Sequence, residues 1–299
     1  MANLLVAASD TSYPVPQTAY QPLSLEGDET AYKAAYRAQG EGAPVLLLHG
    51  FMGSRDCWQG VAPQLAAHYR CISLDLLGFG ESSKPNVRYD IAQLVAFVHE
   101  FVQQQGWVAP VLIGHSLGGW VAAAYALAYP VHSLVLVAPA GIRDDSFCGR
   151  YDHLRPLLWQ TPLVDWVLEG LRPMAIALKQ RAALEQILWI RRELNTQPAA
   201  RSFLVDRMRP EDAIDTVEAS IHNITVPTLV VAGADDATIP LWHCQTYGDR
   251  IPHAQLVVLP EAGHDLPQGH TQRLVEVILP FLTATRPPSP EAEDCAAHP

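Results

Sequence analysis

Cysteine is scarce in this chain, and the few cysteines have no pattern. The five cysteines are odd in number and widely scattered, with no C-x-x-C pair and no combined Cys/His spacing. A disulfide framework and a structural zinc site both need paired or clustered ligands, so the sequence argues against either. A reducing compartment, the cytoplasm, is therefore expected.

Basic residues are also few. The chain has 20 lysines and arginines against 31 aspartates and glutamates, which gives a formal net charge of −11. An acidic surface repels phosphate groups, so neither a nucleic acid nor an anionic membrane is expected as the main partner.

Long apolar runs are missing as well. No segment reaches the roughly 18 apolar residues of a membrane span, and the first residues lack the basic region and long apolar run of a secretory signal. We therefore expect a cytoplasmic enzyme with no stable membrane anchor. Nothing in the sequence predicts an oligomeric state.

What the chain does contain is a regular alternation of short apolar runs with helical patterns. Hydrophobic residues make up 49% and charged residues 17% of the sequence, as in a globular protein. The alternation predicts an α/β fold: roughly eight strands in a mostly parallel sheet, flanked by helices, with an antiparallel hairpin at its start. Buried strands are expected at 45–48, 71–74, 111–113, 134–137, 228–231 and 256–259, the hairpin at 23–25 and 32–36, and helices at 57–68, 89–105, 117–129, 241–249 and 268–283.

The alternation breaks in one place. Between about residues 142 and 223, apolar residues recur at helical spacing without a convincing strand, which predicts a helical cap inserted into the core. The predicted organisation is an N-terminal arm (1–20), a first part of the core (21–141), the cap (142–223), a second part of the core (224–285) and a C-terminal tail (286–299).

A nucleophile motif lies at a predicted strand-to-helix junction. Gly114-His115-Ser116-Leu117-Gly118 matches G-x-S-x-G, and its glycines allow the sharp turn that would expose the serine hydroxyl. A serine hydroxyl is a weak nucleophile at neutral pH. Catalysis would need a base, an acid that orients the base, and donors for the developing oxyanion.

Two backbone amides are candidates for those donors. The Leu117 amide stands at a helix N-terminus, where negative charge is favoured. The sequence His49-Gly50-Phe51 directly follows the strand at 45–48, and its glycine would let the loop fold back so that the Phe51 amide faces Ser116. His49 is expected to orient this loop without transferring a proton.

Two later loops offer a base and an acid. His264 follows the strand at 256–259, and Asp235 and Asp236 follow the strand at 228–231. Loops at the carboxyl ends of parallel strands meet at one edge of a sheet. Serine, acid and histidine also stand in the chain order expected when all three lie on successive strand ends.

On these motifs, together with the loop at 75–82, residues 21–282 resemble the α/β-hydrolase fold superfamily, in its serine esterase and lipase-like branch with a helical cap. The resemblance implies that Ser116 is the nucleophile, that His264 is the general base and that Phe51 and Leu117 donate to the oxyanion. Supporting positions are then His49, Gly50, Gly114, His115 and Gly118.

The identity of the acid follows from the same resemblance. The family pattern G-x-x-D-x-x-x-P falls on Gly233, Asp236 and Pro240, which implies Asp236 as the orienting acid. Alternatives are Asp235, one residue out of that frame, and an acid after the strand at 134–137, Asp144 or Asp145. Asp75 is expected to support its own loop through backbone hydrogen bonds.

The implied activity is hydrolysis of a carboxylic ester of a small molecule, with an apolar acyl group, through an acyl-enzyme and without a metal or organic cofactor. Serine at position 116 disfavours the relatives that use aspartate. Hydrolysis of carbon–carbon bonds, thioester hydrolysis, acyl transfer and perhydrolysis use the same residues and stay open, as does a non-catalytic ligand receptor. Trp159, Trp166 and Trp189 either line an acyl pocket or hold the cap helices together.

Overall fold

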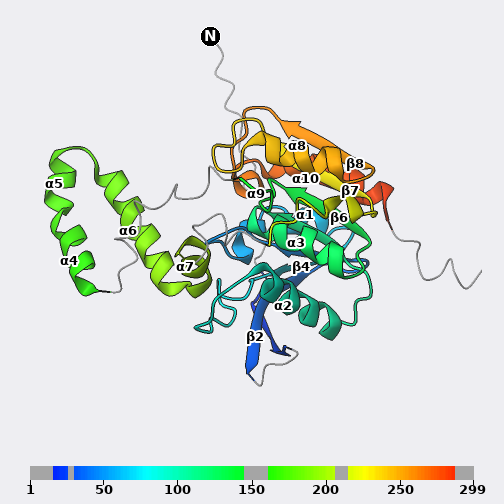
Figure 1. The fold of residues 1–299 in the computed structure, drawn as a ribbon, viewed down its shortest axis with the longest axis horizontal. Helices are drawn as coiled ribbons and strands as arrows, with labels where there is room; N and C mark the ends of the chain where they lie inside the picture. Colours follow the sequence, from blue (N-terminus) through cyan, green and yellow to red (C-terminus); the bar gives the residue numbers. More distant parts are fainter. Residues whose placement is uncertain (1–15, 26–29, 145–160, 206–214, 287–299) are drawn as a thin grey trace, which may run out of the picture.

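The computed structural model describes residues 16–25, 30–144, 161–205 and 215–286. At its centre is an eight-stranded sheet with the strand order β1-β2-β4-β3-β5-β6-β7-β8 (Figure 1). The predicted fold class is confirmed: β2 pairs antiparallel with β1 and with β4, and every other pairing is parallel. The strands are β1 (Ala19–Ser24), β2 (Ala31–Gln39), β3 (Pro44–Leu48), β4 (Arg70–Leu74), β5 (Val111–His115), β6 (Ser133–Val137), β7 (Thr228–Gly233) and β8 (Ala254–Leu259).

Alternate residues of the central strands face two different layers of helices. In β3, Leu46 and Leu48 belong to one hydrophobic cluster and Val45 and Leu47 to another. Both faces of the parallel strands are covered in this way, which is why their sequences read as continuous apolar runs. The first cluster includes side chains of α2 (Ile91–Gln104), α3 (Leu117–Ala128) and α8 (Leu241–Arg250), and the second those of α1 (Ala62–Leu65), α9 (Leu266–Gly269) and α10 (Thr271–Ala284).

The parallel register brings the carboxyl ends of five strands to one edge of the sheet. Leu48 in β3 pairs with Gly114 in β5, and His115 pairs with Val137 in β6. Further along, Gly233 at the end of β7 pairs with Leu259 at the end of β8. The loops that follow these strands therefore start side by side, where an open α/β sheet forms its ligand crevice.

Two of the predicted helices are broken in the structure. Residues 57–68 were expected to form one helix, but they contain part of the 3-10 helix η1 (Arg55–Trp58) and the single turn α1. Pro63, in the first turn of α1, cannot donate to a preceding turn, so a new helix has to start there. The last predicted helix is likewise divided into α9 and α10, with His270 between them.

Four α-helices lie between β6 and β7 in the described chain: α4 (Pro162–Gly170), α5 (Arg172–Ala177), α6 (Arg181–Thr196) and α7 (Pro198–Val205). The C-terminal end of α6 reaches the core through Leu194, a member of the first hydrophobic cluster. Helix α7 packs closely on the core. Its Ala199 stands where a side chain on Gly78 would be, and the Ser202 hydroxyl accepts a hydrogen bond from the Tyr89 amide at 2.9 Å. In Figure 1, α4, α5 and most of α6 stand away from the sheet.

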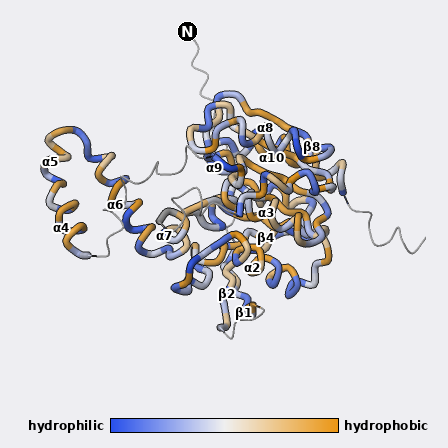
Figure 2. The backbone as a smooth tube through the Cα atoms, viewed as in Figure 1, coloured by the Kyte–Doolittle hydropathy of each residue, from blue (hydrophilic) through white to orange (hydrophobic). Residues whose placement is uncertain are grey.

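The three projecting helices, α4, α5 and α6, share a small apolar cluster of their own. Leu168, Ala175 and Leu184 form its buried centre. Around it, apolar and polar segments alternate along the tube in Figure 2, and several large apolar side chains are exposed. No helix in the described ranges is long and apolar enough to cross a membrane.

Candidate active site

Ser116 stands at a sharp turn between β5 and α3. Its backbone has φ 54° and ψ −116°, a conformation that costs a non-glycine residue energy and is held only by its surroundings. The Ser116 amide donates to the Val137 carbonyl at 2.9 Å, and the Ser116 carbonyl accepts from the Trp120 and Ala140 amides, each at 3.1 Å. The turn is therefore fixed from both sides.

The neighbouring glycines are needed because backbone passes too close for a side chain. A Cβ on Gly114 would lie 2.2 Å from the Gly118 carbonyl oxygen, and one on Gly118 would lie 2.3 Å from the Leu48 carbonyl oxygen. The first contact closes the turn on itself. The second packs the start of α3 against the end of β3. The two glycines are therefore required both by the turn itself and by the packing of the helix on the neighbouring strand.

Ser116, His264 and Asp236 come together in one hydrogen-bonded chain. His264 Nε2 lies 3.0 Å from Ser116 Oγ, and His264 Nδ1 lies 2.7 Å from Asp236 Oδ2. Because the carboxylate can only accept, Nδ1 carries the proton, and Nε2 is left to accept from the serine hydroxyl. Ser116 is 6% exposed, and the side chains of His264 and Asp236 are 23% and 2% exposed.

Asp236 is held as an ionised acceptor. Burial alone would raise the pKa of Asp236, but hydrogen bonds from His264 and from the Thr238 and Ile239 amides bring that pKa below its ordinary value. Both amides lie 2.8 Å from Oδ1, which leaves Oδ2 directed at the imidazole. The carboxylate is thus oriented by its own loop.

The other acids considered from the sequence have different surroundings. Asp235 is exposed, and its amide donates to the Ala262 carbonyl at 2.9 Å. Asp144 Oδ2 lies 3.3 Å from Nε2 of His243, a buried histidine in α8. Asp145 lies outside the described residues.

The loop after β3 passes directly beside the serine. A Cβ on Gly50 would lie 3.1 Å from Ser116 Cβ and 3.0 Å from His115 Nδ1, so a larger residue here would crowd both side chains. The Gly50 carbonyl accepts from His49 Nδ1 at 2.7 Å and from the Gly53 amide at 3.1 Å. Two donors therefore fix the peptide plane between Gly50 and Phe51, and with it the direction of the Phe51 N–H.

His49 is a neutral imidazole with both nitrogens in use. The Leu76 amide donates to Nε2 at 3.0 Å, so the proton is on Nδ1 and is given to Gly50. Burial lowers the pKa of His49, which favours this uncharged form. The geometry agrees with a role in orienting the loop and leaves no nitrogen for proton transfer.

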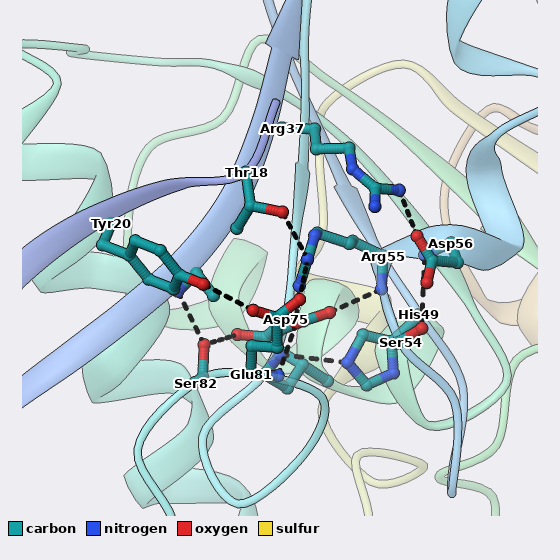
Figure 3. A network of polar contacts seen from close by, with 12 residues as sticks. Thr18, Tyr20, Arg37, His49, Ser54, Arg55, Asp56, Asp75, Glu81 and Ser82 are labelled. Atoms are coloured by element: carbon teal, nitrogen blue, oxygen red, sulfur yellow. Dashed lines mark hydrogen bonds and ion pairs between the residues drawn. The ribbon is translucent and has the colours of Figure 1, made fainter. Parts of the chain in front are cut away.

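A buried ion pair between Arg55 and Asp75 supports the same loop, and the sequence analysis pointed to Asp75 but not to Arg55. Asp75 Oδ1 accepts from the Arg55 amide at 2.6 Å and Oδ2 accepts from the Glu81 amide at 2.8 Å, so the expected backbone hydrogen bonds of Asp75 are present. The Arg55 guanidinium also pairs with Asp75 and Glu81 and donates to Thr18 (Figure 3). The two partners are 20 positions apart in the sequence, and no local pattern marks Arg55.

The predicted pocket tryptophans lie on the projecting helices or outside the described chain. Trp166 in α4 is 68% exposed and Trp189 in α6 is 50% exposed. Trp159 is not among the described residues. Both described side chains are thus largely open to solvent, and their part in a substrate pocket stays a prediction.

The fold and the residues gathered at its strand ends define a class of protein, the α/β hydrolases. The model of the alpha/beta hydrolase family matches residues 45–277. The chain belongs to this family, and the coarse function is that of a hydrolase acting on a small-molecule substrate.

Similar proteins of known name include several kinds of hydrolase. A 2-hydroxy-6-oxo-6-(2'-aminophenyl)hexa-2,4-dienoic acid hydrolase of Metapseudomonas resinovorans is 29% identical over 268 residues, or 86% of this chain and 88% of the relative. Lipase 1 of Psychrobacter immobilis is 32% identical over 251 residues, or 80% of this chain and 75% of the lipase. The fold is shared with a solved thermophilic esterase from Thermogutta terrifontis, at a TM-score of 0.70 and 24% identity, covering 90% of this chain and 100% of the esterase.

Proposed function

We propose that the protein is a serine hydrolase that cleaves a carboxylic ester of a small molecule with an apolar acyl group. One observation carries the proposal: Ser116 Oγ, the His264 imidazole and the Asp236 carboxylate form a continuous chain with distances of 3.0 and 2.7 Å. In this proposal Ser116 is the nucleophile, His264 the general base and Asp236 the acid that orients it.

In the first half of the reaction, His264 Nε2 takes the proton of Ser116 while Oγ attacks the ester carbonyl. The Asp236 carboxylate stabilises the imidazolium that forms. His264 then gives the proton to the departing alcohol, and the acyl group stays on Ser116. In the second half His264 takes a proton from a water molecule as that water attacks the acyl-enzyme, and His264 then returns the proton to Ser116 Oγ as the acid leaves.

The Phe51 and Leu117 amides are the proposed donors to the oxyanion. Within the described residues, neither amide donates a hydrogen bond to another backbone group, so both are available to a ligand. Leu117 is the first residue of α3, where the helix dipole favours negative charge. The Gly50–Phe51 peptide is fixed by His49 and Gly53, and such preorganised donors are an effective source of rate enhancement.

A second reaction has a specific observation behind it. The relative that is 29% identical is named as a hydrolase of a hydroxy-oxo-dienoic acid, a vinylogous diketone whose cleavage breaks a carbon–carbon bond. The same serine, histidine and acid can serve that reaction, because the pocket rather than the catalytic residues selects the substrate. Ester cleavage is preferred because three relatives of 30–32% identity are named as lipases or as a methyl ester esterase, whereas the 29% identical hydrolase is matched over a larger share of its own length than the lipases.

The region between β6 and β7 is proposed to form the cap (142–223) over this site, with Trp166 and Trp189 as apolar contacts for the acyl group. Helix α7 already contacts the loop after β4 through Gly78 and Tyr89. An apolar acyl group fits the apolar side chains that the projecting helices carry.

The deciding experiment compares the wild type with Ser116→Ala on p-nitrophenyl esters from acetate to palmitate. Turnover should peak at one acyl length, and kcat/KM should fall by about a thousandfold or more in the variant. Full activity in Ser116→Ala would contradict the assignment of the nucleophile. A wild type that is inactive on every ester, yet cleaves a hydroxy-oxo-dienoate in a Ser116-dependent way, would replace the ester reaction with the carbon–carbon one.

A further inference from the structure

His115, the residue before Ser116, makes a hydrogen bond that its place in the motif does not suggest. Its Nε2 lies 2.8 Å from the backbone carbonyl oxygen of His264, which is 149 positions away in the sequence. A carbonyl oxygen can only accept, so Nε2 carries the proton and Nδ1 does not. His115 is 9% exposed, and its ring centroid lies 4.9 Å from that of His264.

The environment keeps this imidazole uncharged. Burial lowers the pKa of His115 to about 3, and of the groups that face it the nearby His264 and His49 lower it while the bond to the His264 carbonyl and the Asp236 carboxylate raise it. At neutral pH His115 is therefore a fixed donor. Because its Nε2 proton is engaged with a backbone oxygen, it does not serve as a second base.

The loop that carries His264 is held to the end of β7 two residues earlier, where the Asp235 amide donates to the Ala262 carbonyl at 2.9 Å. Glu261 has φ 55°, and a Cβ on Gly263 would meet no atom within 4 Å. The His264 carbonyl accepts from the Leu266 amide at 2.9 Å, which ties it only to its own loop. The hydrogen bond from His115 instead ties the His264 backbone to the strand that carries the serine.

We propose that His115 is a positioning residue that holds the backbone of His264 so that its imidazole stays between Ser116 and Asp236. The proposal rests on the proposed function, in which His264 is the general base. The same strand end then fixes both reacting partners, since β5 ends in His115 and the next residue is Ser116. A displacement of the base by about 1 Å is enough to cost a hundredfold in rate.

The test uses three substitutions that differ in the donor they offer. The side-chain amide of His115→Gln reaches about as far as imidazole Nε2 and can donate to the same carbonyl. The amide of His115→Asn is too short, and His115→Phe keeps the ring but has no donor. For each purified full-length variant, kcat and KM are measured on the best p-nitrophenyl ester, together with the rate of Ser116 labelling by a fluorophosphonate and the thermal midpoint.

We expect His115→Gln to stay within about threefold of the wild type in kcat and in labelling rate. His115→Asn and His115→Phe should lose about 10- to 100-fold in both, with KM changed less than about twofold. If His115→Phe does not fold, the comparison of the glutamine and asparagine variants decides. Equal activity of these two variants at equal thermal midpoints would overturn the proposal.

A second experiment distinguishes a positioning role of His115 from a general contribution of His115 to folding. In a His264→Ala background, adding His115→Asn should leave the residual labelling rate of Ser116 unchanged, because the group through which His115 acts is gone. A further tenfold loss in that background would overturn the proposal. Labelling does not depend on the substrate, so inactivity on esters with normal labelling rejects the ester chemistry alone, whereas no labelling of the wild type rejects both.

Discussion

Side chains are tightly packed in one region of this protein and largely exposed in another. At the strand ends around Ser116, backbone and side chains leave almost no freedom: glycines are required by contacts of 2.2 and 2.3 Å, and Asp236 accepts from three donors. In the projecting helices, large side chains such as Trp166 and Ile176 are more than half exposed around a small apolar centre.

Under the proposed function, the first region carries out the reaction and the second selects the substrate. A site that transfers protons has to hold donors and acceptors within tenths of an ångström, which requires dense packing and complete hydrogen bonding. A surface that selects among substrates tolerates change, because the catalytic groups do not depend on it. The four predictions below test this contrast, from the largest expected effect to the smallest.

The largest effect is expected at the acid. Asp236→Asn should lower kcat/KM by about 10³- to 10⁴-fold, because an amide can no longer hold His264 in the tautomer that accepts from serine. The matched control is the exposed neighbour Asp235→Asn, which should change kcat/KM less than about twofold. If the control loses as much activity as Asp236→Asn, the acid has been assigned to the wrong residue. Both are measured by ester hydrolysis at neutral pH.

Glycine to alanine substitutions in the two regions should have opposite signs. Gly114→Ala should cost about 3 kcal/mol or more in the free energy of unfolding, since its Cβ would overlap the Gly118 carbonyl. Gly170→Ala in α4 meets no atom within 4 Å and should stabilise the helix by up to about 1 kcal/mol. Urea unfolding measures both, and a neutral Gly114→Ala would show that the turn can relax.

Acid should weaken the region of the strand ends through its buried histidines. Burial lowers the pKa of His49 and of His115, the latter to about 3, whereas an unfolded histidine titrates near 6.5. Below pH 6.5 the unfolded chain therefore binds protons that the folded chain does not. The free energy of unfolding should then fall with decreasing pH, by up to about 1.4 kcal/mol per pH unit for each histidine.

The variant that checks this slope is His115→Gln, which removes one titrating group but keeps a donor. Its free energy of unfolding should fall less steeply than that of the wild type between pH 7 and pH 5. The segment 161–205 contains no histidine, so it adds no histidine titration to this slope. Parallel slopes for wild type and variant would mean that His115 is charged or exposed in the folded state.

The smallest change in stability is expected on the projecting helices. Trp166→Ser and Trp189→Ser should alter the free energy of unfolding by about 0.5 kcal/mol or less, since both side chains are at least half exposed. The buried Leu184→Ala serves as the control and should cost about 2 kcal/mol. If the tryptophans line an acyl pocket, the ratio of kcat/KM between long and short esters should change severalfold in these variants. A stability loss as large as the control's would indicate instead that they hold the helices together.

Local patterns in the sequence determined much of this protein. The strands at 45–48, 71–74 and 111–113 were recognisable because residues covered on both faces are apolar throughout. The G-x-S-x-G motif was recognisable because backbone crowding around Ser116 admits only glycine two residues before and two residues after it. The hairpin and the inserted helices followed from their periodicity, and these features together predicted the fold and the family.

Tertiary structure decided which distant groups meet. Only the assembled fold pairs Arg55 with Asp75, gives His264 a contact with Asp236 while Asp144 faces His243, and directs His115 at the His264 carbonyl. The break between η1 and α1 also escaped the helical pattern. The physical reason is range: apolar periodicity and backbone crowding act within a few residues, whereas a hydrogen bond between strand ends depends on how the whole sheet brings them together.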